Sequence, residues 1–257
     1  MSNATALQTN NTTISDNNLT IDSILETINN LPEASGGSSD NSYWLSILDR
    51  SITKLENEEI TILGNYAINE CTQMTSVNLP NVTKIGSYCF RQCTALTDIS
   101  FSNNYTIGSA CFIYCTGLKN INLRGLFQAN SNCFGYCSGL ENVFLPDTEI
   151  FQTYVFRECT NLKVVDLPKV KTINANGFLN DISLEKVILR TDSVCTLLNK
   201  NAFTGSSIES GTGYIYVPDE LVDTYKTATN WSTYANQIKP LSQLGINDNG
   251  NASGGSN

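Results

Sequence analysis

Histidine is absent from this sequence of 257 residues. Without an imidazole, the Ser-His and Cys-His pairs that activate nucleophiles cannot form, and a common zinc ligand is missing. The sequence also lacks an apolar run of the roughly 18 residues that a membrane helix needs. Residues 1–20 have neither the basic nor the apolar region of a secretory signal. We expect no membrane insertion, and a surface role would need another route out of the cell or a signal cleaved beforehand.

Positive charge is scarce as well. The chain has 15 Lys and Arg against 24 Asp and Glu, a net charge of −9, and only 15% of its residues are charged. Nucleic acids and anionic membranes attract basic patches, so no nucleic-acid partner is expected. Polarity comes mostly from Asn, Thr and Ser.

One pattern of large apolar residues returns every 22 residues through the middle of the chain. Its anchor position holds, in six successive copies, Ile68, Phe90, Phe112, Phe134, Phe156 and Phe178. Aliphatic residues recur six and nine positions later, as Leu96 and Ile99 do after Phe90. A fixed period of roughly 20 to 50 residues is the signature of stacked repeats, so the sequence predicts a solenoid of about six coils.

Each predicted coil contains a short strand and a segment that turns the chain back. In residues 96–101 apolar and polar side chains alternate, as in a strand with one buried face, and stacked coils would pair these strands in parallel. One position of the returning segment holds Gly64, Gly86, Gly108, Asn130 and Asn174. Glycine and asparagine tolerate a positive φ, so we expect a left-handed turn at this position.

Eight of the nine cysteines lie inside the repeat. Five share the slot three residues after the anchor, namely Cys71, Cys93, Cys115, Cys137 and Cys159, and three share the slot before it, namely Cys89, Cys111 and Cys133. Zinc sites favour CxxC pairs or histidine partners, whereas these pairs are spaced CxxxC. We predict that the thiols pack the core, that disulfides fit their parallel side chains poorly, and that the protein uses no metal or cofactor.

Residues 1–34 are predicted to form an N-terminal attachment segment with a short helix at 20–31, followed by a Gly/Ser linker at 35–42. The helix has aliphatic residues at the a and d positions of two heptads: Ile21, Ile24, Ile28 and Leu31. Isoleucine at both positions favours trimers, but a coiled coil needs about three or four heptads. A homotrimer and a lone amphipathic helix that docks on another surface are the two alternatives.

Residues 43–240 are predicted to form the solenoid with a helical cap at each end, since open solenoid ends would expose the core. A helix beginning near Tyr43 would cover the first coil. After an irregular coil around Phe203 and a strand at 214–218, helices from Asp219 to Ala228 and from Trp231 to Ile238 would close the other end. Residues 241–257 are predicted to be a disordered tail.

The pattern Ile-Gly-x-x-Cys/Ala-Phe-x-x-Cys-Thr-x-Leu-x-x-Ile-x-Leu, clearest at residues 85–101 and 107–123, resembles the BspA-type leucine-rich repeat family. The resemblance covers roughly residues 60–218 and implies a leucine-rich-repeat solenoid, mostly β and irregular with few helices. It also implies adhesion or receptor contact and not catalysis, because such repeats occur in bacterial and protist surface proteins and in prophage structural genes. Two flanks, residues 25–34 and 216–231, look like parts of tail-associated proteins from phages of Firmicutes.

These resemblances imply a non-enzymatic binding protein of a phage or prophage virion, assembled in the host cytoplasm. It would attach to virion proteins through residues 1–34 and contact a protein or glycan receptor on a cell surface. The alternatives are a bacterial or protist cell-surface adhesin, a structural virion part without a ligand, and, last, a glycan-active enzyme. An enzyme would need paired acids in one cleft, and the acids of this sequence are scattered.

Two sets of residues are candidates for binding. The outward stripe of the predicted strands includes Asn122, Phe144, Asp166 and Ile188. Tyr114 and Tyr136 lie in a variable pair after the anchor, one coil apart, where they would stack on a sugar ring or hold a partner loop. Exposed aromatic residues on a rigid face are typical binding anchors. The alternative is that these residues only edge the solenoid.

Overall fold

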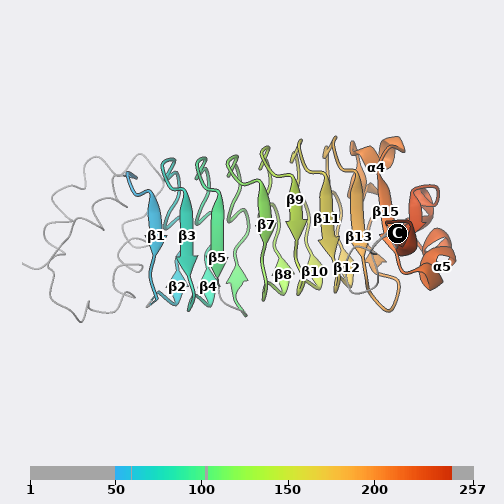
Figure 1. Cartoon of the computed structure of the whole chain (residues 1–257), viewed down its shortest axis with the longest axis horizontal. Helices are drawn as coiled ribbons and strands as arrows, with labels where there is room; N and C mark the ends of the chain where they lie inside the picture. Colours follow the sequence, from blue (N-terminus) through green and yellow to red (C-terminus); the bar gives the residue numbers. More distant parts are fainter. Residues whose placement is uncertain (1–49, 59, 102–103, 245–257) are drawn as a thin grey trace, which may run out of the picture.

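The computed structural model describes residues 50–58, 60–101 and 104–244. They form an elongated stack of coils with short helices gathered at the C-terminal end (Figure 1). The leucine-rich-repeat solenoid predicted from the sequence is therefore confirmed. The predicted attachment segment with Ile21, Ile24, Ile28 and Leu31, the linker and the N-terminal cap helix lie outside the described residues.

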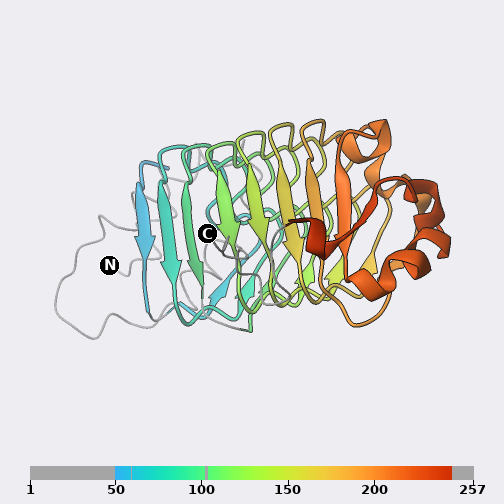
Figure 2. The ribbon, with the colours of Figure 1, turned by 45° about the vertical axis from the view of Figure 1, so that its right-hand side comes forward.

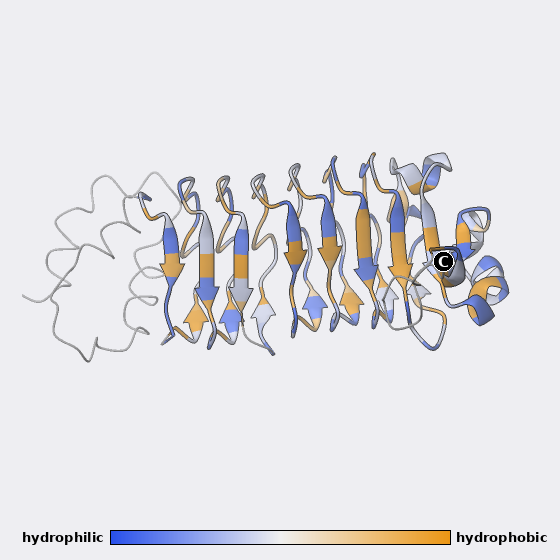
Figure 3. Ribbon diagram, viewed as in Figure 1, coloured by the Kyte–Doolittle hydropathy of each residue, from blue (hydrophilic) through white to orange (hydrophobic). Residues whose placement is uncertain are grey.

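The longer strands stack in parallel along one side of the solenoid. They are β1 (Lys54–Glu56), β3 (Ser76–Leu79), β5 (Asp98–Phe101), β7 (Asn120–Asn122), β9 (Asn142–Phe144), β11 (Val164–Leu167), β13 (Lys186–Leu189), β15 (Tyr214–Val217) and β16 (Ile238–Pro240). Within the regular repeat, from β1 to β5 and from β7 to β13, in-register pairing joins each residue to the one 22 positions later, as Val165 with Val187. The alternation of the sequence places apolar bands at matching heights on consecutive strands (Figure 3).

Shorter strands form the second side. They are β2 (Ile62–Leu63), β4 (Lys84–Ile85), β6 (Thr106–Ile107), β8 (Gln128–Ala129), β10 (Ile150–Phe151), β12 (Thr172–Ile173) and β14 (Thr196–Leu197). The second residue of each is buried, and the first is exposed or half-buried. These strands also pair in parallel, so the solenoid has a hydrogen-bonded ladder on both sides.

The described helices are short and lie towards the C-terminus. They are η2 (Lys200–Phe203), α4 (Ser207–Ser210), η3 (Asp219–Leu221), α5 (Val222–Thr227), η4 (Trp231–Tyr234) and η5 (Leu241–Leu244). The predicted helix from Asp219 is thus a 3-10 turn followed by α5. Trp231, Tyr234 and Tyr225 from these elements are fully buried and cover Phe203, the last ring of the core, as the predicted cap requires.

Two expectations at this end are wrong. Ile238 belongs to strand β16, which pairs with β15, and not to a helix. The added strand covers backbone groups of β15 that would otherwise form a free sheet edge. The ordered chain also extends past residue 240, because Leu241–Leu244 forms η5 and Leu241 is 3% exposed. Residues 245–257 lie outside the described chain.

The core is a column of aromatic rings. Each anchor phenylalanine stacks on that of the next coil, with ring centroids 5.1 Å apart for Phe90 and Phe112 and 5.4 Å for Phe112 and Phe134. The anchors are completely buried from Phe90 to Phe203. Stacked aromatic pairs contribute about 0.5–1.5 kcal/mol each beyond the burial of their area, so the repeat of this one residue stabilises every coil interface.

The predicted left-handed turn at the Gly/Asn position is wrong. None of these residues has a positive φ. A Cβ atom on Gly86 would lie 2.4 Å from the backbone nitrogen of Asn65, so glycine is needed because neighbouring coils approach closely there. Where asparagine replaces it, the side chain bonds the preceding coil: Asn130 Nδ2 donates to the carbonyl of Ile107 at 2.6 Å.

The strand ladder is interrupted in the middle of the solenoid. β5 does not pair with β7, nor β6 with β8, and in the described chain the isolated bridge between Tyr105 and Leu126 stands at this point. Phe101 occupies the slot of Leu79 and Leu123, and its ring packs against buried Tyr105 with centroids 5.2 Å apart. These two rings are in contact at the coil junction where the strands do not pair, and hydrogen bonds between the turns continue across it.

Candidate binding surfaces

The predicted outward stripe lies on the face of the six-stranded sheet. The register places Asn122 beside Phe144, Phe144 beside Asp166, and Asp166 beside Ile188. A groove of about 290 Å³ runs over β7, β9 and β11 and is lined in part by Asn122, Phe144 and Asp166. Phe144 is half-buried in it. The structure therefore places Asn122 and Asp166 on the two strands that flank Phe144. We call this groove the sheet groove.

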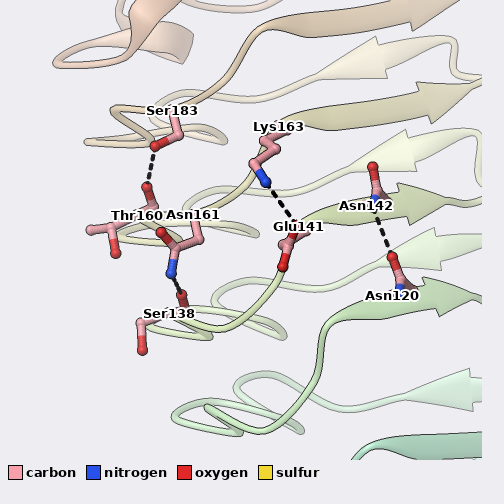
Figure 4. Close-up of polar contacts among 8 residues, drawn as sticks. All are labelled: Asn120, Ser138, Glu141, Asn142, Thr160, Asn161, Lys163 and Ser183. Carbon is pink, nitrogen blue, oxygen red and sulfur yellow. Dashed lines mark hydrogen bonds and ion pairs between the residues drawn. The ribbon is translucent and has the colours of Figure 1, made fainter.

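Polar side chains of neighbouring coils are paired with one another beside this groove (Figure 4). Asn142 Nδ2 donates to Asn120 Oδ1 at 2.8 Å, and Lys163 Nζ lies 2.8 Å from Glu141 Oε2. The Lys163 ammonium holds the pKa of the Glu141 carboxyl below its ordinary value. Because such exposed ion pairs contribute little to stability, their main effect is to fix the orientation of the side chains around the groove.

Asp166 was predicted to be an outward binding residue, but in the structure its carboxylate is already paired with Arg190. Its carboxylate accepts two hydrogen bonds from Arg190, at 2.9 Å from Nη2 and 3.3 Å from Nε. The side chains of Asp166 and Arg190 are only 18% and 13% exposed. A two-point pair of this kind is rigid. Asp166 therefore lines the sheet groove as one half of a fixed ion pair and not as a free charge.

Ile188 is not an exposed binding residue. It is 4% exposed, although its strand position points outward. Tyr216 of β15 lies beside it in register, and η5, which contacts β15, crosses this end of the sheet face (Figure 2). The C-terminal elements therefore cover the end of the stripe, and a sequence pattern read within the repeat cannot report this cover.

Tyr114 and Tyr136 lie in the turns and not on the sheet face. Their rings stack on each other with centroids 4.7 Å apart and an angle of 16° between the planes, and Tyr114 is 39% exposed. The predicted spacing of one coil is confirmed. However, each ring covers one face of the other, so less aromatic area is left for a sugar to stack on.

Two further residues on this surface, Arg157 and Tyr154, were not among the predicted binding residues. The guanidinium carbon of Arg157 lies 5.1 Å from the ring centroid of Tyr136 and 5.6 Å from that of Tyr154. We call Tyr114, Tyr136, Tyr154 and Arg157 the tyrosine row. In the sequence, Arg157 occupies a variable position of the repeat that holds Gly135 one coil earlier and Leu179 one coil later. The identity of a residue at such a position does not predict which side chains of neighbouring coils it contacts.

The cysteines after the anchor form a ladder of hydrogen bonds. The Sγ atoms of Cys93, Cys115, Cys137 and Cys159 each donate to the carbonyl of the residue 25 positions earlier, as Cys115 to Phe90 at 3.0 Å and Cys137 to Phe112 at 3.1 Å. Burial raises the pKa of the Cys137 thiol to about 12. A thiol in such surroundings is a weak nucleophile and metal ligand, since both roles need the thiolate.

Within residues 50–244, outside the gaps at 59 and 102–103, no three Cys, Asp or Glu side chains gather closely enough to hold a metal ion. No helix of the described part has the length and apolar character to cross a membrane. What the geometry provides is two fixed surfaces, the sheet groove and the tyrosine row.

Solved structures similar to this chain are leucine-rich repeat proteins. A Treponema pallidum leucine-rich repeat protein is 26% identical over 53% of this chain, with a TM-score of 0.48. The pneumococcal vaccine antigen PcpA is 18% identical over 74% of this chain (TM-score 0.46), and a leucine-rich cell surface protein of Faecalibacterium prausnitzii is 16% identical over 80% of this chain and 83% of its own length (TM-score 0.37). The chain spans 66% of the Treponema protein and 40% of PcpA.

A search of curated proteins found no match. The model of the BspA type leucine rich repeat region matches residues 49–163 and 127–212, with six copies. The matched ranges together cover more than half of the chain and include both candidate surfaces. This protein belongs to the BspA-type leucine-rich repeat family.

Proposed function

We propose that the protein is a non-enzymatic binding protein that holds a protein or glycan receptor of a cell surface in the sheet groove. The observation that carries the proposal is Phe144, a half-buried ring in a groove of about 290 Å³ on a continuous hydrogen-bonded sheet. An aromatic anchor surrounded by oriented amides and a fixed ion pair is the arrangement that binding hot spots favour.

The chemistry of the groove supports binding more than turnover. Its polar groups are the amides of Asn120, Asn122 and Asn142 and the carboxylate of Asp166, which is already paired with Arg190. A glycosidase needs two carboxyl groups about 5–10 Å apart on either side of the scissile bond. Asp166 alone, held by an arginine, does not supply that pair.

For the setting, we favour a phage or prophage virion, with residues 1–34 attached to virion proteins and the solenoid presented outward. The resemblance of residues 25–34 and 216–231 to phage tail-associated proteins supports this setting. The family supports a bacterial or protist cell-surface adhesin equally well, and we keep that as the alternative.

The setting is tested on the full chain and on a version that begins at Asn41, both expressed in a host that produces the virions. Purified particles are probed with an antibody against the solenoid. The proposal expects the full chain on virions and the shorter one absent. Finding the full chain on the cell envelope and not on particles would support the adhesin, and equal recovery of both versions on particles would refute the role given to residues 1–34.

The binding role is tested by retention on arrays of cell-surface glycans and extracellular proteins, followed by mass spectrometry of the bound material. The proposal expects saturable retention of an unaltered ligand. Cleavage products would identify a glycan-active enzyme, and the absence of retention on arrays and on whole cells would indicate a structural virion part.

A further inference from the structure

Two positions in the turns of each coil have a left-handed backbone, with φ near +60°. The first holds Tyr66, Tyr88, Ala110, Asn132, Tyr154 and Asn176, and the second holds Glu70, Gln92, Tyr114, Tyr136, Glu158 and Asn180. Among residues with a Cβ, asparagine tolerates this conformation best, and a bulky side chain there is an outlier. Local backbone energy therefore favours asparagine and does not account for tyrosine at 114, 136 and 154.

Arg157 has an unusual environment within this row. Its guanidinium lies over the rings of Tyr136 and Tyr154, and its Nε atom is buried without a hydrogen-bond partner. Among the described residues no carboxylate forms an ion pair with it. Glu158, the next residue, accepts a hydrogen bond from Asn180 Nδ2 at 2.7 Å. Arg157 is thus a positioned cation without a counter-charge in a chain with a net charge of −9.

Arg91 provides an internal comparison, because it occupies the same slot three coils earlier. Its Nη1 atom lies 3.6 Å from Glu70 Oε1, and Glu70 stands in the slot that Tyr136 occupies next to Arg157. Where the neighbour is Glu70, the arginine has a carboxylate of its own chain beside it, which it shares with Arg50 at 3.2 Å. Where the neighbour is Tyr136, the charge stays uncompensated and the two tyrosines fix its position.

The arrangement also selects between kinds of anionic partner. One face of Tyr136 is stacked on Tyr114 and Arg157 lies over the ring, so the row does not offer that ring to a sugar. An arginine among one exposed and two half-buried tyrosines suits a protein partner, because Tyr and Arg are the preferred anchors of protein interfaces. Arginine binds carboxylates through two parallel hydrogen bonds.

We propose that the tyrosine row is a second docking surface, at which Arg157 binds an Asp or Glu side chain of a partner protein. It rests on the proposed binding role of the solenoid but not on the sheet groove. The tyrosines hold the guanidinium in place by cation–π contact, and the incoming carboxylate supplies the missing charge.

The test uses the full chain and an array of 12-residue peptides that carry one to three Asp or Glu beside apolar residues, with matched Asn and Gln versions. Polygalacturonate and heparin serve as anionic glycan probes. We expect binding of a subset of acidic peptides, at least about tenfold weaker binding of their amide versions, and a similar loss in R157Q, because a hydrogen bond between charged groups is worth about that factor. The control R91Q should bind like the wild type.

Binding of the glycans alone, no preference for acidic peptides, or wild-type affinity in R157Q would each overturn the proposal. If R157Q lowers the melting temperature, R157K decides, since lysine keeps the charge but cannot form the two-point contact. Weaker peptide binding by R157K supports the proposal, and unchanged binding refutes it. Phe144→Ser should leave peptide binding intact, so failure here and failure of the sheet groove are distinguishable.

Discussion

Asp181 occupies the slot that a cysteine fills in the five preceding coils. It is completely buried, its Oδ1 atom accepts a hydrogen bond from the Cys159 amide at 2.9 Å, and its Oδ2 atom has no partner among the described residues. Burial raises the pKa of its carboxyl well above the ordinary value. Burial therefore shifts this carboxyl towards its protonated form in the folded chain.

This environment predicts a pH-dependent stability. A raised pKa stabilises the fold at pH values below the unfolded pKa of about 4, and that contribution is lost as the pH rises through the folded pKa. Asp181→Asn keeps the acceptor and adds a donor without titrating. Because the neutral amide does not titrate, we expect D181N to be more stable than the wild type at pH 8.

Urea unfolding of both proteins from pH 4 to pH 8 measures this difference. The advantage of D181N should shrink towards pH 4. A constant difference across this range, or a less stable D181N at pH 8, would show that Asp181 is not held as an acid.

Gly86 shows a second residue-level requirement. A Cβ atom there would meet backbone atoms of the neighbouring coil at 2.4 Å, whereas a Cβ on Gly135 has no neighbour closer than 3.4 Å. Overpacking against backbone costs about 1–3 kcal/mol or more. We expect G86A to lose about 1–3 kcal/mol in the free energy of unfolding by urea and G135A to lose clearly less. Equal losses in the two variants would contradict close coil contact as the role of Gly86.

At the scale of elements, the strands were predictable because alternation and period act together. Val143 and Leu145 face the core for the same reason as Val165 and Leu167. The interruption after β5 was not predictable, because Phe101 keeps the 22-residue step and changes only the volume at its position, whereas the bridge from Tyr105 to Leu126 spans 21 residues, a local shift that the period does not report. Similarly, β16 pairs with β15, which would otherwise have an unpaired edge. The helix-like spacing of Trp231, Tyr234 and Ile238 in the sequence does not indicate this pairing.

The interruption makes a prediction for hydrogen exchange. The amides of Glu141 and Asn142 donate to the carbonyl of Lys119, and no backbone bond in the described chain joins the equivalent Lys119 and Asn120 amides to Thr97. Amides without a stable hydrogen bond exchange faster. In native-state exchange followed by NMR, Lys119 and Asn120 should exchange at least about tenfold faster than Glu141 and Asn142. Equal protection at the four amides would mean that the ladder is continuous in solution.

At the scale of the molecule, the stack explains which surfaces could be foreseen. The 22-residue period predicted which strand residues face inward and which face outward, and so predicted that Asn122, Phe144 and Asp166 lie beside one another on neighbouring strands. It could not assign the cover over Ile188, which comes from elements outside the repeat, or the pairing of Asp166 with Arg190. The tyrosine row depends on which side chains meet across coils, and that needs coordinates.

The central claim is that the solenoid binds a cell-surface receptor in the sheet groove without altering it. The most direct measurement is a binding isotherm of the labelled full chain on a panel of bacterial and epithelial cells. Three proteins are compared: the wild type, Phe144→Ser, and the control Asn78→Ser, which changes an exposed residue of the same stripe three coils earlier. Thermal melting first establishes that all three are folded.

We predict saturable binding by the wild type and by N78S. F144S should bind about 30-fold more weakly, because the loss of a binding anchor costs about 2 kcal/mol or more. Equal affinity of F144S and the wild type would contradict the account, as would chemical change of the receptor during binding.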